Sequence, residues 1–152
     1  MNRVGLDRAR ELGAREAGLA VVVTIREGGS VQASVANAGV LHHPLTGEPM
    51  VGFVARGGTK KLANLRARPT VTVVFRSGWE WVAVEGDAEL LGPDDSLEGL
   101  DPGDALRVIR TVYAAAVGGK QEEWAELDAV VAAERHTAVL IRPSRVYSNP
   151  SQ

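Results

Sequence analysis

The sequence predicts a mainly β fold, a small closed or partly closed antiparallel barrel with helices outside it. Short apolar runs follow one another along the chain, with glycine or proline at most of the bends between them. The helical patterns stand together near the end instead of alternating with the strands, which argues against a doubly wound parallel sheet. We therefore expect six antiparallel strands with flanking helices.

The first elements are a helix and a hairpin. Residues 7–17 are rich in Arg, Glu and Ala with Leu12 as the main apolar side chain, which predicts a short and mostly solvated helix. LAVVVTIR at 19–26 is almost continuously apolar, as in a strand buried on both faces. The turn sequence EGGS at 27–30, with glycines at 28 and 29, then predicts a tight hairpin into a second strand over 31–41.

The middle of the chain predicts three further strands. HHPLTGEP at 42–49 is a turn pattern and precedes a strand at 50–56, and TVTVVFR at 70–76 predicts the next strand. WEWVAVEGDAELLG at 79–92 predicts the fifth strand. Gly86 interrupts it, where we expect a bulge or a barrel corner.

The last part holds two helices and a strand. After an acidic loop at 93–103, amphipathic patterns predict helices at 104–117 and 121–135, with Gly118-Gly119 between them. HTAVLIRPSRVY at 136–147 predicts the sixth strand. The prediction for the whole chain is one domain, residues 1–152, with the helical segment 104–135 between the last two strands.

Composition excludes several classes of protein. The 152 residues are 45% hydrophobic and 24% charged, which suits one globular domain with a real core. Cysteine is absent, so a disulfide scaffold, a thiolate metal site and a cysteine nucleophile are excluded. The net charge of -2 argues against a nucleic-acid binder, and the N-terminal stretch has neither a signal peptide pattern nor a membrane span. We expect a soluble, cytoplasmic protein.

Residues 57–69, GGTKKLANLRARP, gather four cationic side chains behind two glycines. If Thr59 to Ala67 is helical, Leu62 and Leu65 lie side by side as a buried anchor. The opposite arc then carries Lys60, Lys61, Asn64 and Arg68. Free backbone N–H groups at the start of such a helix, together with the Thr59 hydroxyl and the lysines, form a phosphate-sized anion site.

Two interpretations of this cluster remain from the residues alone: a phosphate site, or the solvated face of a short connecting helix. The segment lacks the GxxxxGK[ST] of a P-loop and the GxGxxG of a dinucleotide fold, so those nucleotide-binding classes are excluded.

Other polar and aromatic residues give weaker signals. His42 and His43 are adjacent without a third ligand at metal spacing, so we expect a turn and no metal site. A lone His136 at the mouth of the last strand is more often structural than a general acid. Trp79 and Trp81 at strand spacing belong either to the core or to a pocket or dimer interface. No catalytic constellation is evident.

The order of these parts resembles a known family. A strand, hairpin and strand precede T-K-K-x-x-N-L-x-x-x-P, followed by an apolar strand and a Trp-rich strand ending V-x-G. This is similar to the pyridoxamine 5'-phosphate oxidase-like flavin-binding split barrels over roughly residues 17–149. Within them, the closest resemblance is to the deazaflavin-dependent reductases, which use coenzyme F420 in place of FMN.

The resemblance implies a cofactor site at a two-fold dimer interface. Thr59, Lys60 and Lys61 match the element that holds the cofactor phosphate in the family, in a motif that also contains Asn64. The positions that line the ring are matched by Gln32 and Ser34. Arg56 is placed to reach the phosphate or the acidic tail of a deazaflavin, and Trp79 to approach the ring or substrate pocket, on the partner chain if the dimer requires it.

The resemblance also implies the chemistry. We expect a homodimeric F420-dependent reductase that transfers hydride to a small unsaturated or quinone-like acceptor. The pyridoxal-recognising residues of a true pyridoxamine phosphate oxidase are not evident in SRVYSNPSQ, so that oxidation is not expected. The alternatives are an FMN-binding oxidoreductase of the same family and a non-catalytic carrier of flavin, deazaflavin or haem. Small residues Ala33, Ala36 and Ala38, which would leave room above a ring, favour the enzyme.

Overall fold

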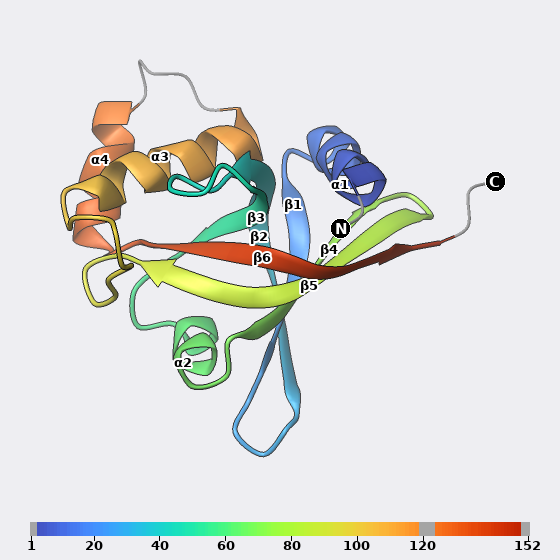
Figure 1. Ribbon diagram of the computed structural model, residues 1–152, viewed down its shortest axis with the longest axis horizontal. Helices are drawn as coiled ribbons and strands as arrows, with labels where there is room; N and C mark the ends of the chain where they lie inside the picture. The colour runs from blue at the N-terminus through green and yellow to red at the C-terminus, as the bar shows by residue number, and fades with distance from the viewer. Residues whose placement is uncertain (1–2, 119–123, 150–152) are drawn as a thin grey trace.

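Six strands close into one antiparallel barrel, as predicted (Figure 1). The computed structural model describes residues 3–118 and 124–149. The strands are β1 (Leu19–Ile25), β2 (Val31–His42), β3 (Pro49–Ala55), β4 (Thr70–Ser77), β5 (Glu80–Leu91) and β6 (Thr137–Ser148). The helices are α1 (Arg3–Arg15), α2 (Lys60–Ala67), α3 (Asp104–Val117) and α4 (Trp124–Ala133).

The barrel order is β1-β2-β3-β6-β5-β4, and it closes through the pairing of β4 with β1. The register of β5 against β6 shifts between Glu85 and Gly86, which confirms the predicted irregularity. A Cβ at Gly86 would lie 1.9 Å from the carbonyl oxygen of Arg142, so only glycine lets the two strands approach this closely.

Strand alternation divides the apolar side chains between two cores. Val139 and Ile141 of β6 point into the barrel, whereas Ala138 and Leu140 point outward against α3 and α4. The same division holds in β3, where Phe53 lies inside the barrel. Figure 1 shows α3 and α4 lying together over one side of the barrel, with α1 at another side and α2 below. The helical layer therefore packs against β2, β3 and β6 and leaves the lower end of the barrel to α2.

Helix α1 differs from its prediction. It begins at Arg3 instead of residue 7, and Leu6, Ala9 and Leu12 are all buried in the barrel core. Ala9 belongs to the buried stripe of α1, and its small side chain lets the helix approach the strands. Gly13 also lies close to the barrel, since a Cβ there would meet Phe75 at 3.4 Å. Most side chains at 7–17 are exposed, as expected, but the prediction missed the buried face, since small residues at helical spacing can also form a packing face.

Strand β1 was predicted to be buried on both faces, and in this single chain that is wrong. Ala20, Val22 and Thr24 face the core, whereas Leu19 and Val21 are exposed on the outer face. Helices α3 and α4 do not extend over this part of the barrel (Figure 1). The nearly continuous apolar pattern of this strand reflects an outer face that is apolar although no helix of the same chain covers it.

Part of the predicted second amphipathic helix, residues 121–123, lies outside the described residues, and α4 itself runs from Trp124 to Ala133. Of the helices that the structure describes, none combines the length and the hydropathy that crossing a membrane requires.

Candidate phosphate and cofactor site

Helix α2 forms as the sequence pattern predicts. Leu62 and Leu65 are buried at 0% and 2% exposure, so the predicted leucine anchor is confirmed. The first bond of the helix runs from the Ala63 N–H to the Thr59 carbonyl. The N–H groups of residues 60–62 therefore have no partner within the helix and are available to an anion at its N-terminus.

Thr59 caps the helix by backbone position without using its side chain. Its backbone is extended, at φ -76° and ψ 155°, but its hydroxyl makes no capping hydrogen bond. The Oγ1 atom is buried and has no hydrogen-bond partner. Because an unpaired buried hydroxyl costs about 1–3 kcal/mol, a free Thr59 hydroxyl at a helix N-terminus fits a site completed by an anionic ligand.

Lys61 follows Thr59 by two residues and is half-buried. Its ammonium lies 5.9 Å from the ring centroid of Phe53, and burial lowers the pKa of Lys61 below the ordinary lysine value. Lys60, by contrast, is exposed. Neither lysine forms an ion pair with a carboxylate in the part of the chain that the structure describes.

The wider surroundings of α2 are also positive. Ten other cations are paired with carboxylates, but within residues 5–118 and 124–149 the arginine and lysine side chains without such a partner are Arg26, Lys60, Lys61, Arg68 and Arg76. Three of these are in or directly after α2, and Arg26 lies in the neighbouring β1–β2 turn. Arg68 donates instead to the carbonyl of Ile25, at 2.9 Å. This end of the barrel therefore offers uncompensated positive charge to an anion.

Asn64 was predicted on the cationic arc, and the structure instead buries it at 9% exposure. Its Nδ2 donates to Thr24 Oγ1 at 3.1 Å and to Gln32 Oε1 at 3.2 Å. The helical pattern could not reveal this because the partners come from the β1–β2 hairpin. Asn64 thus connects α2 to the strand that carries the predicted ring-lining residues.

Gln32 and Ser34 lie on the inward face of β2. Their cross-strand partners are Thr24 and Val22, both buried, and each of the two side chains is itself only half-buried. The β1–β2 hairpin extends below the barrel beside α2 (Figure 1). The structure therefore brings Gln32 to the α2 site through Asn64 and places Ser34 two residues further along the same face.

The predicted row of small residues on β2 needs one correction. Ala36 and Ala38 share the inward face with Ser34, but Ala33 lies on the outer face because side chains alternate along a strand. Room above a ring would come from the first two alanines alone.

The two glycines before Thr59 are more constrained than a flexible linker. The Gly57 N–H donates to the carbonyl of Glu134 at 3.0 Å. This N–H is therefore not among the free groups that could bind an anion. A Cβ at Gly57 would lie 2.8 Å from Arg135 Cβ, and Gly58 has φ +78°. Both positions require glycine, one for close packing and one for its backbone angle.

Arg56 is exposed and forms an ion pair with Glu134, its Nη1 lying 3.6 Å from Oε2. Arg56 directly precedes Gly57, and the two roles expected of it, at the phosphate and at the acidic tail, stay predictions.

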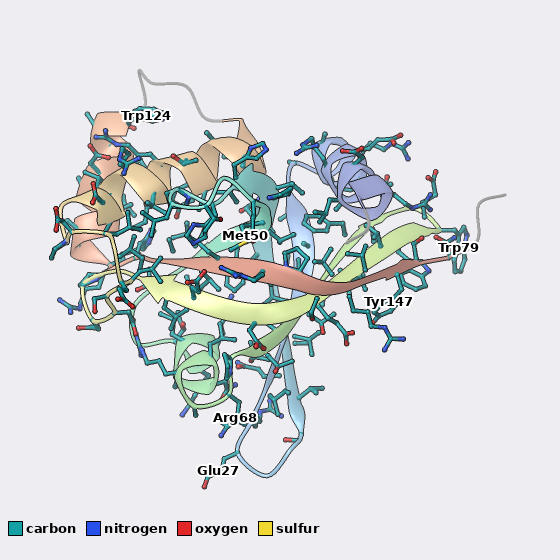
Figure 2. All side chains as sticks on the ribbon, in the orientation of Figure 1. Glu27, Met50, Arg68, Trp79, Trp124 and Tyr147 are labelled. Atoms are coloured by element: carbon teal, nitrogen blue, oxygen red, sulfur yellow. The ribbon has the colours of Figure 1, made fainter. Side chains whose placement is uncertain are left out.

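Trp79 lies at the other end of the molecule from α2 (Figure 2). It is 94% exposed in the β4–β5 turn, before the strand begins at Glu80. Asn149 holds the turn, donating to the Trp79 carbonyl at 3.2 Å and accepting from the Trp81 N–H at 3.2 Å. Arg15 of α1 pairs with Glu80 at 3.2 Å. A large apolar ring is thus presented to solvent on a well-anchored turn, out of reach of the same chain's α2.

The two notable histidines have structural partners. His43 accepts at Nδ1 from the Leu45 N–H in the predicted turn, and its Nε2 lies 3.1 Å from Glu89 Oε1. His136 is buried, with Nδ1 3.0 Å from the Tyr113 hydroxyl and Nε2 3.0 Å from a Glu134 oxygen. Across residues 3–118 and 124–149, no three His, Asp or Glu side chains are grouped to hold a metal ion.

The fold and this site lead to a family. The model of the pyridoxamine 5'-phosphate oxidase family matches residues 7–148, nearly the whole chain. The chain therefore belongs to the pyridoxamine 5'-phosphate oxidase-like family, which confirms the resemblance seen in the sequence. No curated protein matches the chain.

Solved structures share the fold at low sequence identity. A protein of unknown function from Agrobacterium tumefaciens is 16% identical with a TM-score of 0.63; the match covers 100% of this chain but only 59% of that protein. An FMN-binding, pyridoxamine 5'-phosphate oxidase-related protein from Nostoc punctiforme is 17% identical with a TM-score of 0.60, covering 96% and 82%. A protein named F420 reductase is 14% identical with a TM-score of 0.53, covering 86% and 90%.

Proposed function

We propose that this protein is an oxidoreductase that binds reduced coenzyme F420 and transfers hydride to a small unsaturated or quinone-like acceptor. The observation that carries the proposal is the buried, unpartnered Thr59 hydroxyl at the N-terminus of α2, beside two lysines without carboxylate partners. Membership of the family and the similarity to an F420 reductase support it.

The phosphate of the cofactor is assigned to the start of α2. Thr59 Oγ1 and the N–H groups of residues 60–62 donate hydrogen bonds, and Lys60 and Lys61 supply charge. Charge-assisted hydrogen bonds of this kind contribute about 1.5–3 kcal/mol each. The half-buried Lys61 is the more important lysine, because its charge has already lost part of its hydration.

The ring is assigned to the inward face of β2. A deazaflavin, when bound and reduced, supplies the hydride itself, so the chain has to position the ring and exclude water. Gln32 and Ser34 would line the ring. Asn64 holds Gln32 in place by donating a hydrogen bond from Nδ2 to Gln32 Oε1, and it has no role of its own in the chemistry. No acid or base is assigned to the proton transfer.

The second copy of the chain is assigned to the outer face of β1 and β2. Leu19, Val21, Val31 and Val35 are 50%, 38%, 56% and 63% exposed there. Val21 and Val35 are direct cross-strand partners, so exposed apolar side chains of the two strands lie side by side on this face. A dimer through this face would cover these side chains, and the exposed Trp79 would then approach the partner's cofactor site.

A fluorescence titration with F420 and, side by side, with FMN tests the proposal. We expect Lys61→Ala to weaken binding of F420 about ten- to a hundredfold, since it removes a charge-assisted contact. Arg107→Ala, which removes an exposed cation on α3, is the matched control and should leave affinity unchanged. Unchanged affinity in Lys61→Ala would place the phosphate elsewhere.

The same titration addresses the two alternatives. Tighter binding of FMN than of F420 would make this an FMN oxidoreductase, for which the Nostoc protein is the supporting similarity. Stopped-flow oxidation of the bound, reduced cofactor then separates an enzyme from a carrier. An enzyme shows oxidation that accelerates with added quinone, whereas a carrier of flavin, deazaflavin or haem shows binding alone.

A further inference from the structure

A cavity separate from the proposed cofactor site lies between the loop after β5 and helices α3 and α4. Its volume is about 510 Å³. It is lined by the end of β5 and the loop after it, the first half of α3, part of α4 and the residue before β6. It contains none of the residues assigned to the phosphate or the ring, so it is separate from the proposed cofactor site.

The floor and walls of this cavity are apolar. Leu91, Ile109 and Val131 are buried at 2%, 2% and 7% exposure, and Leu100 and Leu106 add to the walls. The volume falls in the range of about 300–1,000 Å³ that is usual for small-molecule sites.

The charged groups around the cavity are already paired, and each pair joins two elements. Arg110 binds Asp128 through two nitrogens and ties α3 to α4. Arg66 donates to both oxygens of Asp95, at 2.9 and 2.6 Å, and ties α2 to the loop.

Two further polar groups of the wall, Asp94 and His136, are paired as well. Asp94 accepts from Arg135, which ties the loop to the end of α4. His136 uses both ring nitrogens, one with Tyr113 and one with Glu134. The cavity is therefore framed by fixed contacts and presents no unpaired charge in its lining.

From this lining we infer that the cavity is a second binding site, for a neutral and mainly apolar small molecule. A charged ligand would lose its hydration against leucine, isoleucine and valine side chains without finding an unpaired counter-charge. A neutral apolar ligand loses little hydration and gains burial over the same surface. The inference is independent of the cofactor assignment.

The experiment uses the neutral fluorescent probe N-phenyl-1-naphthylamine and a matched pair of variants. Ala132 and Ala133 are neighbours near the end of α4 and both are exposed, but only Ala132 lines the cavity. Tryptophan at position 132 fills the cavity, whereas tryptophan at position 133 adds the same ring outside it. We expect saturable binding to the wild-type protein, at least about tenfold weaker binding to Ala132→Trp, and unchanged binding to Ala133→Trp.

A second filling variant protects the test against a folding defect. Ala105→Trp enters the cavity from the opposite wall, in the first turn of α3, and should weaken the probe in the same way. Circular dichroism shows which variants are folded. Equal probe affinity in the folded filling variants and in Ala133→Trp would overturn the inference, because the probe would then bind elsewhere, for example at the exposed β1–β2 face. The absence of saturable binding to wild type would also overturn it.

Discussion

Lys61 combines a positive charge with partial burial, and this sets the pH range in which it can bind an anion. Burial lowers its folded-state pKa below the ordinary lysine value of 10.5. The unfolded chain therefore holds this proton more tightly than the folded chain. The charged side chain costs stability below the folded-state pKa, and that cost disappears as the pH rises to the unfolded value.

Phosphate binding should show the opposite pH dependence at this residue. A bound anion favours the protonated lysine, so cofactor affinity should fall as the pH rises through the lowered pKa of Lys61, before 10.5 is reached. Lys61→Arg keeps its charge throughout this range, since a guanidinium titrates above about 12. Titrations from about pH 8 upward should therefore show an earlier fall for wild type than for Lys61→Arg. Parallel curves would mean that Lys61 does not contact the anion.

Asn64 shows what the sequence could and could not reveal at this scale. The motif that contains it predicted the helix, the leucine anchor and the cationic residues. Its burial depends on Thr24 and Gln32, which are 40 and 32 residues away in the chain. Helical periodicity contains no information on such distant partners, so the pattern placed Asn64 with the charged side chains.

The elements follow from the sequence where a local physical reason exists. The strand order required tertiary information, but the bulge at Gly86 was predictable because a glycine interrupts an otherwise regular alternation. The packing face of α1 was not predictable in the same way, because Ala9 and Gly13 contribute to it through their small size. The sequence pattern shows residues 93–103 only as an acidic loop, and the place of this loop in the wall of a cavity depends on Arg66 and Arg135, which come from two other segments.

At the level of elements, the loop before α2 is positioned by the end of α4. Gly57 packs against Arg135 and donates to the Glu134 carbonyl, while Arg56 pairs with the Glu134 side chain. This contact sets where α2 begins, and therefore where its free N–H groups point.

Gly57→Ala tests this arrangement. The added Cβ would lie 2.8 Å from Arg135 Cβ and 2.9 Å from its carbonyl oxygen, so the backbone has to shift. We expect a loss of about 1–3 kcal/mol in the free energy of unfolding, measured in urea, and weaker cofactor binding. Gly103→Ala is the control, because a Cβ there meets nothing within 4 Å and its φ is -66°. Unchanged stability and affinity in Gly57→Ala would show that the loop adapts freely.

On the scale of the whole molecule, the apolar outer face of β1 and β2 is solvent-exposed in a monomer and would be covered in the proposed dimer. The run LAVVVTIR has the pattern of a strand covered on both sides, and in one chain only its inner face is covered. The sequence pattern and the single-chain structure agree if a second copy supplies the missing layer.

Val35→Glu should therefore break the dimer. Val35 is 63% exposed and lies opposite Val21 on this face, so a buried carboxylate there would have no partner in the self-association surface. We expect light scattering to give twice the chain mass for wild type and the single-chain mass for Val35→Glu at the same concentration. Cofactor affinity should fall with the dimer, because the proposal brings the partner's Trp79 towards the cofactor site. Val130→Glu, at a 45% exposed valine on α4, is the control and should leave the mass and the cofactor affinity unchanged.

Two results would rule out this face as the interface: a wild type that is monomeric at all concentrations, or a Val35→Glu variant that is as dimeric as wild type. In either case Trp79 would have no partner site to reach.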